Sequence, residues 1–135
     1  MKTFVVSMTL LVLASAAGCS NLQPVDSSTR ANRDHLTREQ IQASGLATAF
    51  DLIRAQRVSW LRERHRPYRR SDEAIAVYLD GSYFGGQESL YHFATRDIFS
   101  LRRIRPEDTL RLLGRDHPNG AILIGRYEGS FLQEH

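Results

Sequence analysis

The sequence predicts an α+β fold in which short helices pack on a small mixed β-sheet. Residues 75–79 (IAVYL) and 121–124 (AILI) are apolar on both faces, as expected for strands in the middle of a sheet. The dipeptide Asp80-Gly81, which follows the first of these stretches, is typical of a tight hairpin. Capping residues bound several short helical segments around these strands. Segments of this kind build a layered α+β domain.

Two helices are expected before the first of these strands. Thr37 and Gln40 have the spacing of a capping box, and Leu36 is placed to contact Ile41 across the first turn. Gly45 is suited to end this helix. A second helix is indicated by apolar residues at helical spacing, which are Leu46, Ala49, Phe50 and Ile53.

The segments that follow are shorter. Residues 58–61 can continue the second helix or open a strand, and we expect a strand. Trp60 belongs to the core in both cases, because a large aromatic ring contributes most to stability when it is buried. Residues 88–92 are expected to form a helical turn and residues 98–104 a strand.

A last helix is expected to begin at Pro106. Proline suits the first helical position, and the acidic residues after it suit the positive end of the helix dipole. Leu110 and Leu113 are expected to face the core. Turns around this helix and the hairpin need residues that tolerate positive φ, and the expected turn positions are Asp80, Gly81, Gly114, Asn119 and Gly120.

The N-terminus has the three-part layout of a secretory signal. Lys2 supplies a positive charge, residues 4–13 are apolar, and small residues at 15–18 directly precede Cys19. The apolar run is much shorter than the roughly 20 residues that span a bilayer. Cys19 is the only cysteine of the 135-residue chain, so it has no partner for a disulfide within the chain.

Residues 16–19 (AAGC) resemble the lipobox of bacterial lipoproteins. The resemblance implies that residues 1–18 are removed and that Cys19 carries the lipid and becomes the mature N-terminus. Ser20 behind the cysteine resembles a signal for sorting to the outer membrane, facing the periplasm. The competing interpretation is an ordinary signal peptide with a chance cysteine. We expect residues 19–35 to be a flexible tether, residues 36–128 a single domain and residues 129–135 a C-terminal tail.

The order of the predicted elements resembles the plug domain of TonB-dependent outer-membrane receptors. The matching stretches are residues 36–53, 77–81 (VYLDG), 97–104 (DIFSLRRI) and 119–124 (NGAILI). The resemblance implies a plug-like α+β domain. A receptor also needs a large β-barrel, for which this chain is too short, so we expect a binding or assembly module of the cell envelope and not a transporter. An outer-membrane barrel or another envelope protein is the expected partner.

Motifs for catalysis or metal binding are few, and we expect neither an enzyme nor a cofactor. The five histidines have no spacing typical of a metal site, and no serine lies in a G-x-S-x-G elbow. Asp116-His117 could serve as a general base, but loop polarity also explains this pair. The alternative function is a small lipid-anchored periplasmic hydrolase or carbohydrate-active enzyme, which would need a pocket with converging ionisable groups.

Positive charge is concentrated in one segment of a chain whose net charge is +3. We expect a solvated loop here or, alternatively, contact with the phosphates of anionic lipid or lipopolysaccharide. Export of the chain argues against a nucleic-acid partner. The arginines concerned are Arg62, Arg64, Arg66, Arg69 and Arg70.

Overall fold

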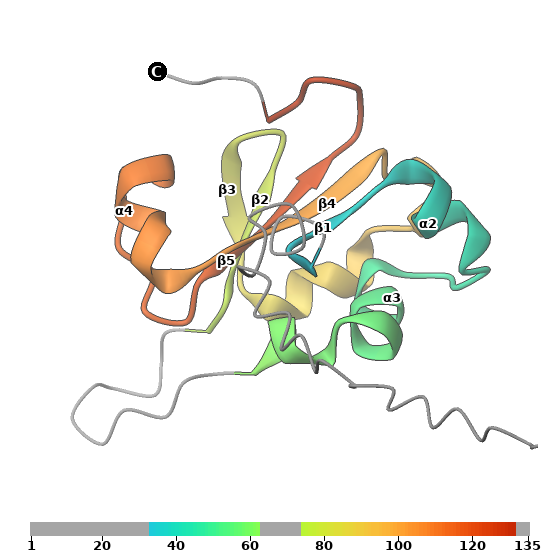
Figure 1. Cartoon of the computed structure of the whole chain (residues 1–135), viewed down its shortest axis with the longest axis horizontal. Helices are drawn as coiled ribbons and strands as arrows, with labels where there is room; N and C mark the ends of the chain where they lie inside the picture. The colour runs from blue at the N-terminus through green and yellow to red at the C-terminus, as the bar shows by residue number, and fades with distance from the viewer. Residues whose placement is uncertain (1–32, 63–73, 132–135) are drawn as a thin grey trace, which may run out of the picture.

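The computed structural model describes residues 33–62 and 74–131, which form a five-stranded mixed sheet with helices on both faces (Figure 1). The strands are β1 (His35–Leu36), β2 (Ala76–Leu79), β3 (Ser82–Gly85), β4 (Ser100–Ile104) and β5 (Ala121–Gly125). The α-helices are α2 (Arg38–Ala43), α3 (Ala49–Gln56) and α4 (Pro106–Leu113). Three 3₁₀ helices complete the fold: η1 (Val58–Leu61), η2 (Gln87–His92) and η3 (Thr95–Asp97). The predicted α+β class is confirmed.

Strand β5 occupies the centre of the sheet, whose order is β1-β4-β5-β2-β3. It runs parallel to β2 and antiparallel to β4, and all five of its residues are buried. Ile122 and Ile124 point to one face of the sheet, and Ala121 and Leu123 point to the other. The sequence prediction of two apolar central strands is therefore confirmed.

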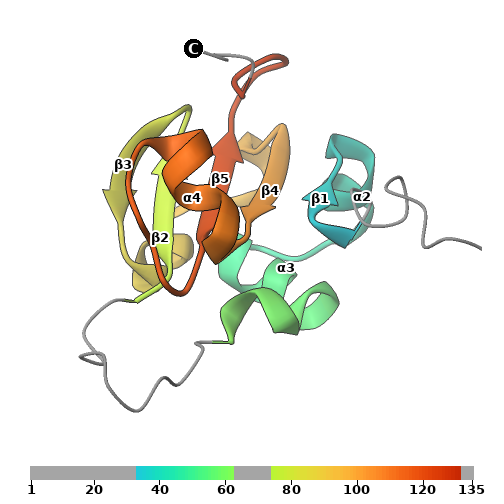
Figure 2. The ribbon, with the colours of Figure 1, turned by 60° about the vertical axis from the view of Figure 1, so that its left-hand side comes forward.

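The two faces of the sheet carry cores of different size. Helices α2 and α3 and the 3₁₀ helices η1 and η2 cover the face with the large core, which is built from Leu36, Ile41, Ala49, Leu52, Ile53, Trp60, Ile75, Val77, Leu90, Ile98, Leu101, Ile122 and Ile124. Helix α4 covers the other face (Figure 2). The smaller core on that face contains Ala76, Tyr78, Ile104, Ala121 and Leu123.

The predicted capping box at the start of α2 is present. The Gln40 N–H donates to the Thr37 hydroxyl (3.5 Å), and the Thr37 N–H donates to the Gln40 side-chain oxygen (3.0 Å). After the helix, Gly45 adopts a positive φ of 65°. The second helix begins later than expected, since Thr48 caps it and Leu46 precedes it.

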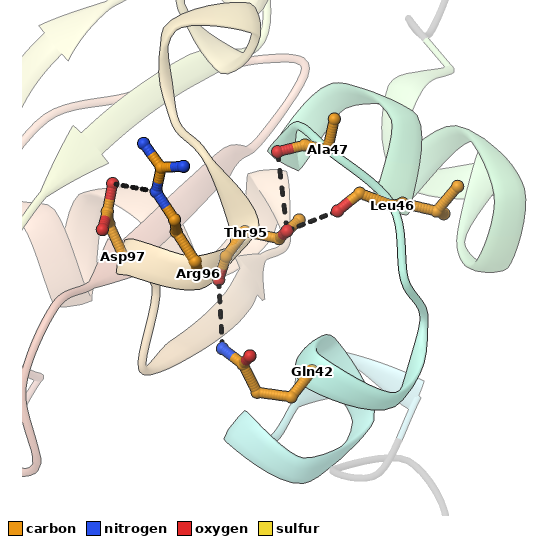
Figure 3. Close-up of polar contacts among 6 residues, drawn as sticks. All are labelled: Gln42, Leu46, Ala47, Thr95, Arg96 and Asp97. Atoms are coloured by element: carbon orange, nitrogen blue, oxygen red, sulfur yellow. Dashed lines mark hydrogen bonds and ion pairs between the residues drawn. The ribbon is translucent and has the colours of Figure 1, made fainter.

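The α2–α3 connection is tied to η3 by hydrogen bonds around Thr95 (Figure 3). The Thr95 hydroxyl donates to the carbonyl oxygen of Leu46, and the side-chain amide of Gln42 donates to the carbonyl oxygen of Thr95 (3.4 Å). The Thr95 N–H donates to the carbonyl oxygen of Ala47 (3.0 Å). Segments about 50 residues apart in the chain are thereby joined at main-chain level, which holds α2 and α3 against the sheet.

Two further predictions about the helices and strands are wrong. Residues 58–61 form the 3₁₀ helix η1 and not a strand, because the Trp60 N–H bonds back to the carbonyl oxygen of Arg57 (2.8 Å). Trp60 is nevertheless in the core, as expected. In α4, Leu110 is 64% exposed, because the helix turns Thr109 and the half-buried Leu113 toward the sheet instead.

The predicted turns are found where they were expected, although at Asn119-Gly120 only the glycine adopts a positive φ. Asp80 and Gly81 have φ values of 46° and 86°, and they join β2 to β3 in an antiparallel hairpin. Gly114 ends α4 in a left-handed conformation. In the turn before β5, the Gly120 N–H donates to the carbonyl oxygen of His117 (2.8 Å), and Gly120 adopts a φ of 84°.

Candidate functional site

One end of the sheet holds the candidate site. The strand register places Ala121 opposite Ile104 on one side and opposite Ala76 on the other. The end of β4 and the beginnings of β2 and β5 therefore lie together, and we name this the cleft end of the sheet. The opposite end carries the Asp80-Gly81 turn and is named the hairpin end.

A cleft of about 520 Å³ opens at the cleft end. It lies between the chain segment before β1, the α3–η1 junction, the last residues of β4 and the first turn of α4. The residues lining it are Arg33, Asp34, Gln56, Arg57, Val58, Ser59, Trp60, Arg103, Arg105 and Glu107.

Positive charge dominates this lining, which contains four arginines and two carboxylates. Asp34 is already engaged, because one of its carboxylate oxygens accepts from both Nη2 (2.6 Å) and Nε (2.9 Å) of Arg105. Residues two apart on an extended chain share one side, so Arg103 and Arg105 lie on the same side as Leu101, which faces the large core. The guanidinium groups of Arg103 on β4 and of Arg105 directly after it thus continue the core side of the sheet into the cleft.

Arg57 occupies the junction between α3 and η1. Its N–H donates to the carbonyl oxygen of Ile53 (2.7 Å), and its Nη1 donates to the carbonyl oxygen of Gln56 (2.9 Å). Its Nε is buried and has no hydrogen-bond partner among the described residues. Leaving a buried donor unpaired costs about 1–3 kcal/mol, and more when the group is charged.

Trp60 connects the cleft to the large core. Its side chain is 1% exposed, and its indole N–H donates to the carbonyl oxygen of Arg33 (3.1 Å). The backbone N–H of Arg103 donates to the carbonyl oxygen of Asp34 (2.8 Å). These two bonds fix the backbone of residues 33–34, so the chain enters the domain along the wall of the cleft.

The lining is suited to binding an anion. Guanidinium groups match phosphate and carboxylate oxygens in geometry and charge. The described residues that line the cleft include one hydroxyl group, that of Ser59, and neither histidine nor cysteine. Across residues 33–62 and 74–131, no group of three or more His, Cys, Asp or Glu side chains is placed to hold a metal ion.

Most of the functional residues predicted from sequence lie outside the described part of the chain. These are Cys19 and the loop arginines Arg64, Arg66, Arg69 and Arg70. Arg62 is described; it is exposed, directly follows η1 and does not line the cleft. The cleft arginines could not be recognised as one group from the sequence, because they come from three separate segments. The alternation of Arg103 and Arg105 across Ile104 was the one local signal of a shared basic side.

The structure brings the Asp116-His117 pair into a different setting from the exposed loop that was expected. His117 is half-buried, and its Nε2 lies 2.8 Å from the hydroxyl oxygen of Tyr78, while Asp116 is exposed. The Tyr83 ring lies parallel to the His117 ring, with centroids 6.3 Å apart. Burial raises the pKa of Tyr78 above its usual value. This hydrogen bond joins the loop after α4 to β2.

Comparison of the chain with protein-family models, with curated proteins and with solved structures finds no match in any of the three. Within the described residues, no helix has the length and apolar character required to cross a bilayer.

Proposed function

We propose that this protein is a lipid-anchored binding module of the cell envelope and that its arginine-lined cleft binds an anionic group. One observation carries the assignment of the site. Four arginines from three separate segments line one open cleft together with only two carboxylates, one of which is already paired with Arg105. Such an arrangement is stabilised when an acceptor with several oxygens enters it.

Binding fits the lining better than catalysis does. A hydrolase would need a nucleophile and a base within hydrogen-bonding distance of each other. The cleft instead offers the Ser59 hydroxyl beside four guanidinium groups, which are poor proton acceptors. Of its two carboxylates, Asp34 is paired with Arg105 and Glu107 is exposed. The ligand class that follows is a phosphate or a carboxylate, free or on a larger partner.

The envelope location rests on the sequence of the N-terminus. Cys19 directly follows small residues and an apolar run, and it is the only cysteine in the chain. The order of sequence motifs also supports a plug-like module, with an outer-membrane barrel or another envelope protein as its partner. The acidic groups of such a partner would suit the cleft.

The fluorescence of Trp60 provides a direct test of anion binding. Trp60 is the only tryptophan of the chain and lies in the cleft wall. Titrating the full mature protein with inorganic pyrophosphate, against sodium chloride of equal ionic strength, should give a saturable change in emission. The Arg57→Gln variant should lose this change. Arg54→Gln should keep it, because Arg54 is an exposed arginine of the same helix that does not line the cleft.

Equal changes in Trp60 emission with pyrophosphate and with chloride would refute specific anion binding in the cleft.

The anchor is tested separately. Cells fed an alkyne analogue of palmitate should label the wild-type chain and not the Cys19→Ala variant, which should leave the membrane fraction. A wild-type chain that stays unlabelled and keeps residues 1–18 would refute the anchor.

A further inference from the structure

The cleft shares its end of the sheet with the point where the N-terminal segment enters the domain. His35 pairs with Arg102, and Leu36 pairs with Leu101, so the preceding residues run alongside the end of β4. Arg33, the first described residue, itself lines the cleft. Any segment that leads from Cys19 therefore reaches the domain at the cleft end.

Other features of the fold also meet at this end. The 3₁₀ helix η1 and the beginning of β2 flank the arginine-rich stretch of the sequence. Both lie toward the bottom of Figure 1, whereas the β2–β3 hairpin is at the top. At the hairpin end, positive charge is neutralised locally. Arg126 donates to the Asp80 carboxylate through its backbone N–H (2.9 Å) and through its Nε (2.6 Å). At the cleft end one of the four lining arginines is paired with Asp34 in a similar way, and the lining keeps more arginines than carboxylates.

We propose that the cleft end faces the membrane that holds Cys19 and that the cleft binds the phosphate of an anionic lipid headgroup. This inference rests on the proposed function, since it requires the lipid anchor. The occupant follows from charge and from chain connectivity. A lipid phosphate offers several oxygens to the guanidinium groups of the cleft, and the anchored bilayer presents many such phosphates beside the point of chain entry.

Chain connectivity is compatible with this orientation. The stretch from Cys19 to Arg33 spans at most about 50 Å, at roughly 3.3–3.6 Å per residue, and it joins the domain at the cleft end. With the cleft end toward the membrane, the lipid anchor and the cleft act on one surface, so the anchor raises the effective concentration of lipid phosphates at the cleft.

Single-cysteine labelling tests the orientation in the full lipoprotein. Cys19 is the only native cysteine, and acylation blocks its thiol, so an introduced cysteine is the single labelling site. Ser59→Cys lies in the cleft, and Ser82→Cys, equally exposed, lies at the hairpin end. A fluorophore on each would be measured in vesicles that carry a headgroup quencher, made of phosphatidylcholine with or without phosphatidylglycerol.

The expected result is strong quenching at position 59 that needs phosphatidylglycerol, with no such change at position 82. Adding Arg57→Gln should abolish the lipid-dependent quenching, and adding Arg54→Gln should leave it intact. Equal quenching at the two positions, or at position 59 in both kinds of vesicle, would overturn the inference. Binding of inorganic phosphate without any lipid-dependent quenching at position 59 would assign the site to free phosphate and also overturn it.

These outcomes separate the two proposals. A chain that never acquires its lipid refutes the anchor itself. A chain that carries the lipid and binds pyrophosphate, yet shows no lipid-dependent quenching at position 59, leaves the proposed function standing and refutes only the orientation.

Discussion

The two faces of the sheet are built in different ways. On the face covered by α2 and α3, the core is continuous and apolar from Leu36 through Trp60 to Ile124. On the face covered by α4, the core is small, and polar groups take part in it. Thr109 is fully buried there, and Tyr78 bonds to His117. The face covered by α2 and α3 is therefore stabilised mainly by apolar burial, whereas the face covered by α4 depends on specific polar contacts.

Thr109 shows how the α4 face works. Its hydroxyl donates to the carbonyl oxygen of Pro106 (2.9 Å) and accepts from the N–H of His117 (3.0 Å). One side chain thus connects the first turn of α4 to the loop that follows the helix. The leucine expected at this interface, Leu110, points to solvent instead. Hydrogen bonds through Thr109 therefore position α4, a role that buried apolar residues usually have in a helix packed on a sheet.

The largest effect should come from truncating the large core. Ile124→Ala should lower the free energy of unfolding by about 2–5 kcal/mol, because it leaves a cavity among fully buried side chains. Leu123→Ala, on the other face of the same strand, should cost about 2 kcal/mol or less, since Leu123 is partly accessible and its neighbours can relax. Urea unfolding of both variants measures the difference. Equal losses of unfolding free energy in the two variants would contradict this difference between the faces.

The turn that leads from the α4 side into β5 should be the next most sensitive feature. Gly120→Ala would place a Cβ 2.6 Å from the carbonyl oxygen of Ile104 at a φ of 84°, which should cost about 1–3 kcal/mol. Gly114→Ala has a similar φ of 67° and open space around its Cβ, so strain alone should cost about 1–2 kcal/mol. Thermal unfolding of the two variants separates the clash from the strain. A larger loss at Gly114 would contradict this account.

Removing the Tyr78 hydroxyl should have a smaller effect. Tyr78→Phe keeps the ring in the small core and loses the hydrogen bond to His117, at a cost of about 0.5–1.5 kcal/mol. Tyr83→Phe is the matched control, because it removes the hydroxyl of an exposed ring that stacks on His117. Chemical denaturation compares them. A Tyr78→Phe variant as stable as the control would show that the α4 face needs no polar link there.

The smallest effect should be a pH dependence that originates at His35 on β1. Burial and then the charge of Arg102 lower the pKa of His35 below its usual 6.5, so the folded protein disfavours the protonated form. Between the lowered pKa and 6.5 the unfolded chain binds more protons, and stability should rise as the pH increases through this range. His35→Gln should flatten this rise in a series of denaturation curves from pH 5 to about pH 7.5. An unchanged slope would exclude His35 as its source.

Local features of the fold could be predicted because they depend on neighbours in sequence. The capping box at Thr37, the hairpin at Asp80-Gly81 and the apolar strand β5 each follow from a few adjacent residues. The 3₁₀ helix η1 was missed because four residues with poor alternation do not distinguish between elements. The side of α4 that faces the sheet was predicted wrongly, because the sequence does not show whether a threonine such as Thr109 is buried or exposed.

The class of the fold, its central strands and its turns could be read from the sequence, since helix caps, alternation and positive φ act over a few residues. The sequence also supplied the grounds for the proposed lipid anchor at Cys19. Long-range packing, in contrast, places Arg33, Arg57, Arg103 and Arg105 around one cleft at the end of the sheet where the chain enters. These residues lie up to about 70 positions apart, and their charges meet only because strand pairing and the burial of Trp60 bring their segments together.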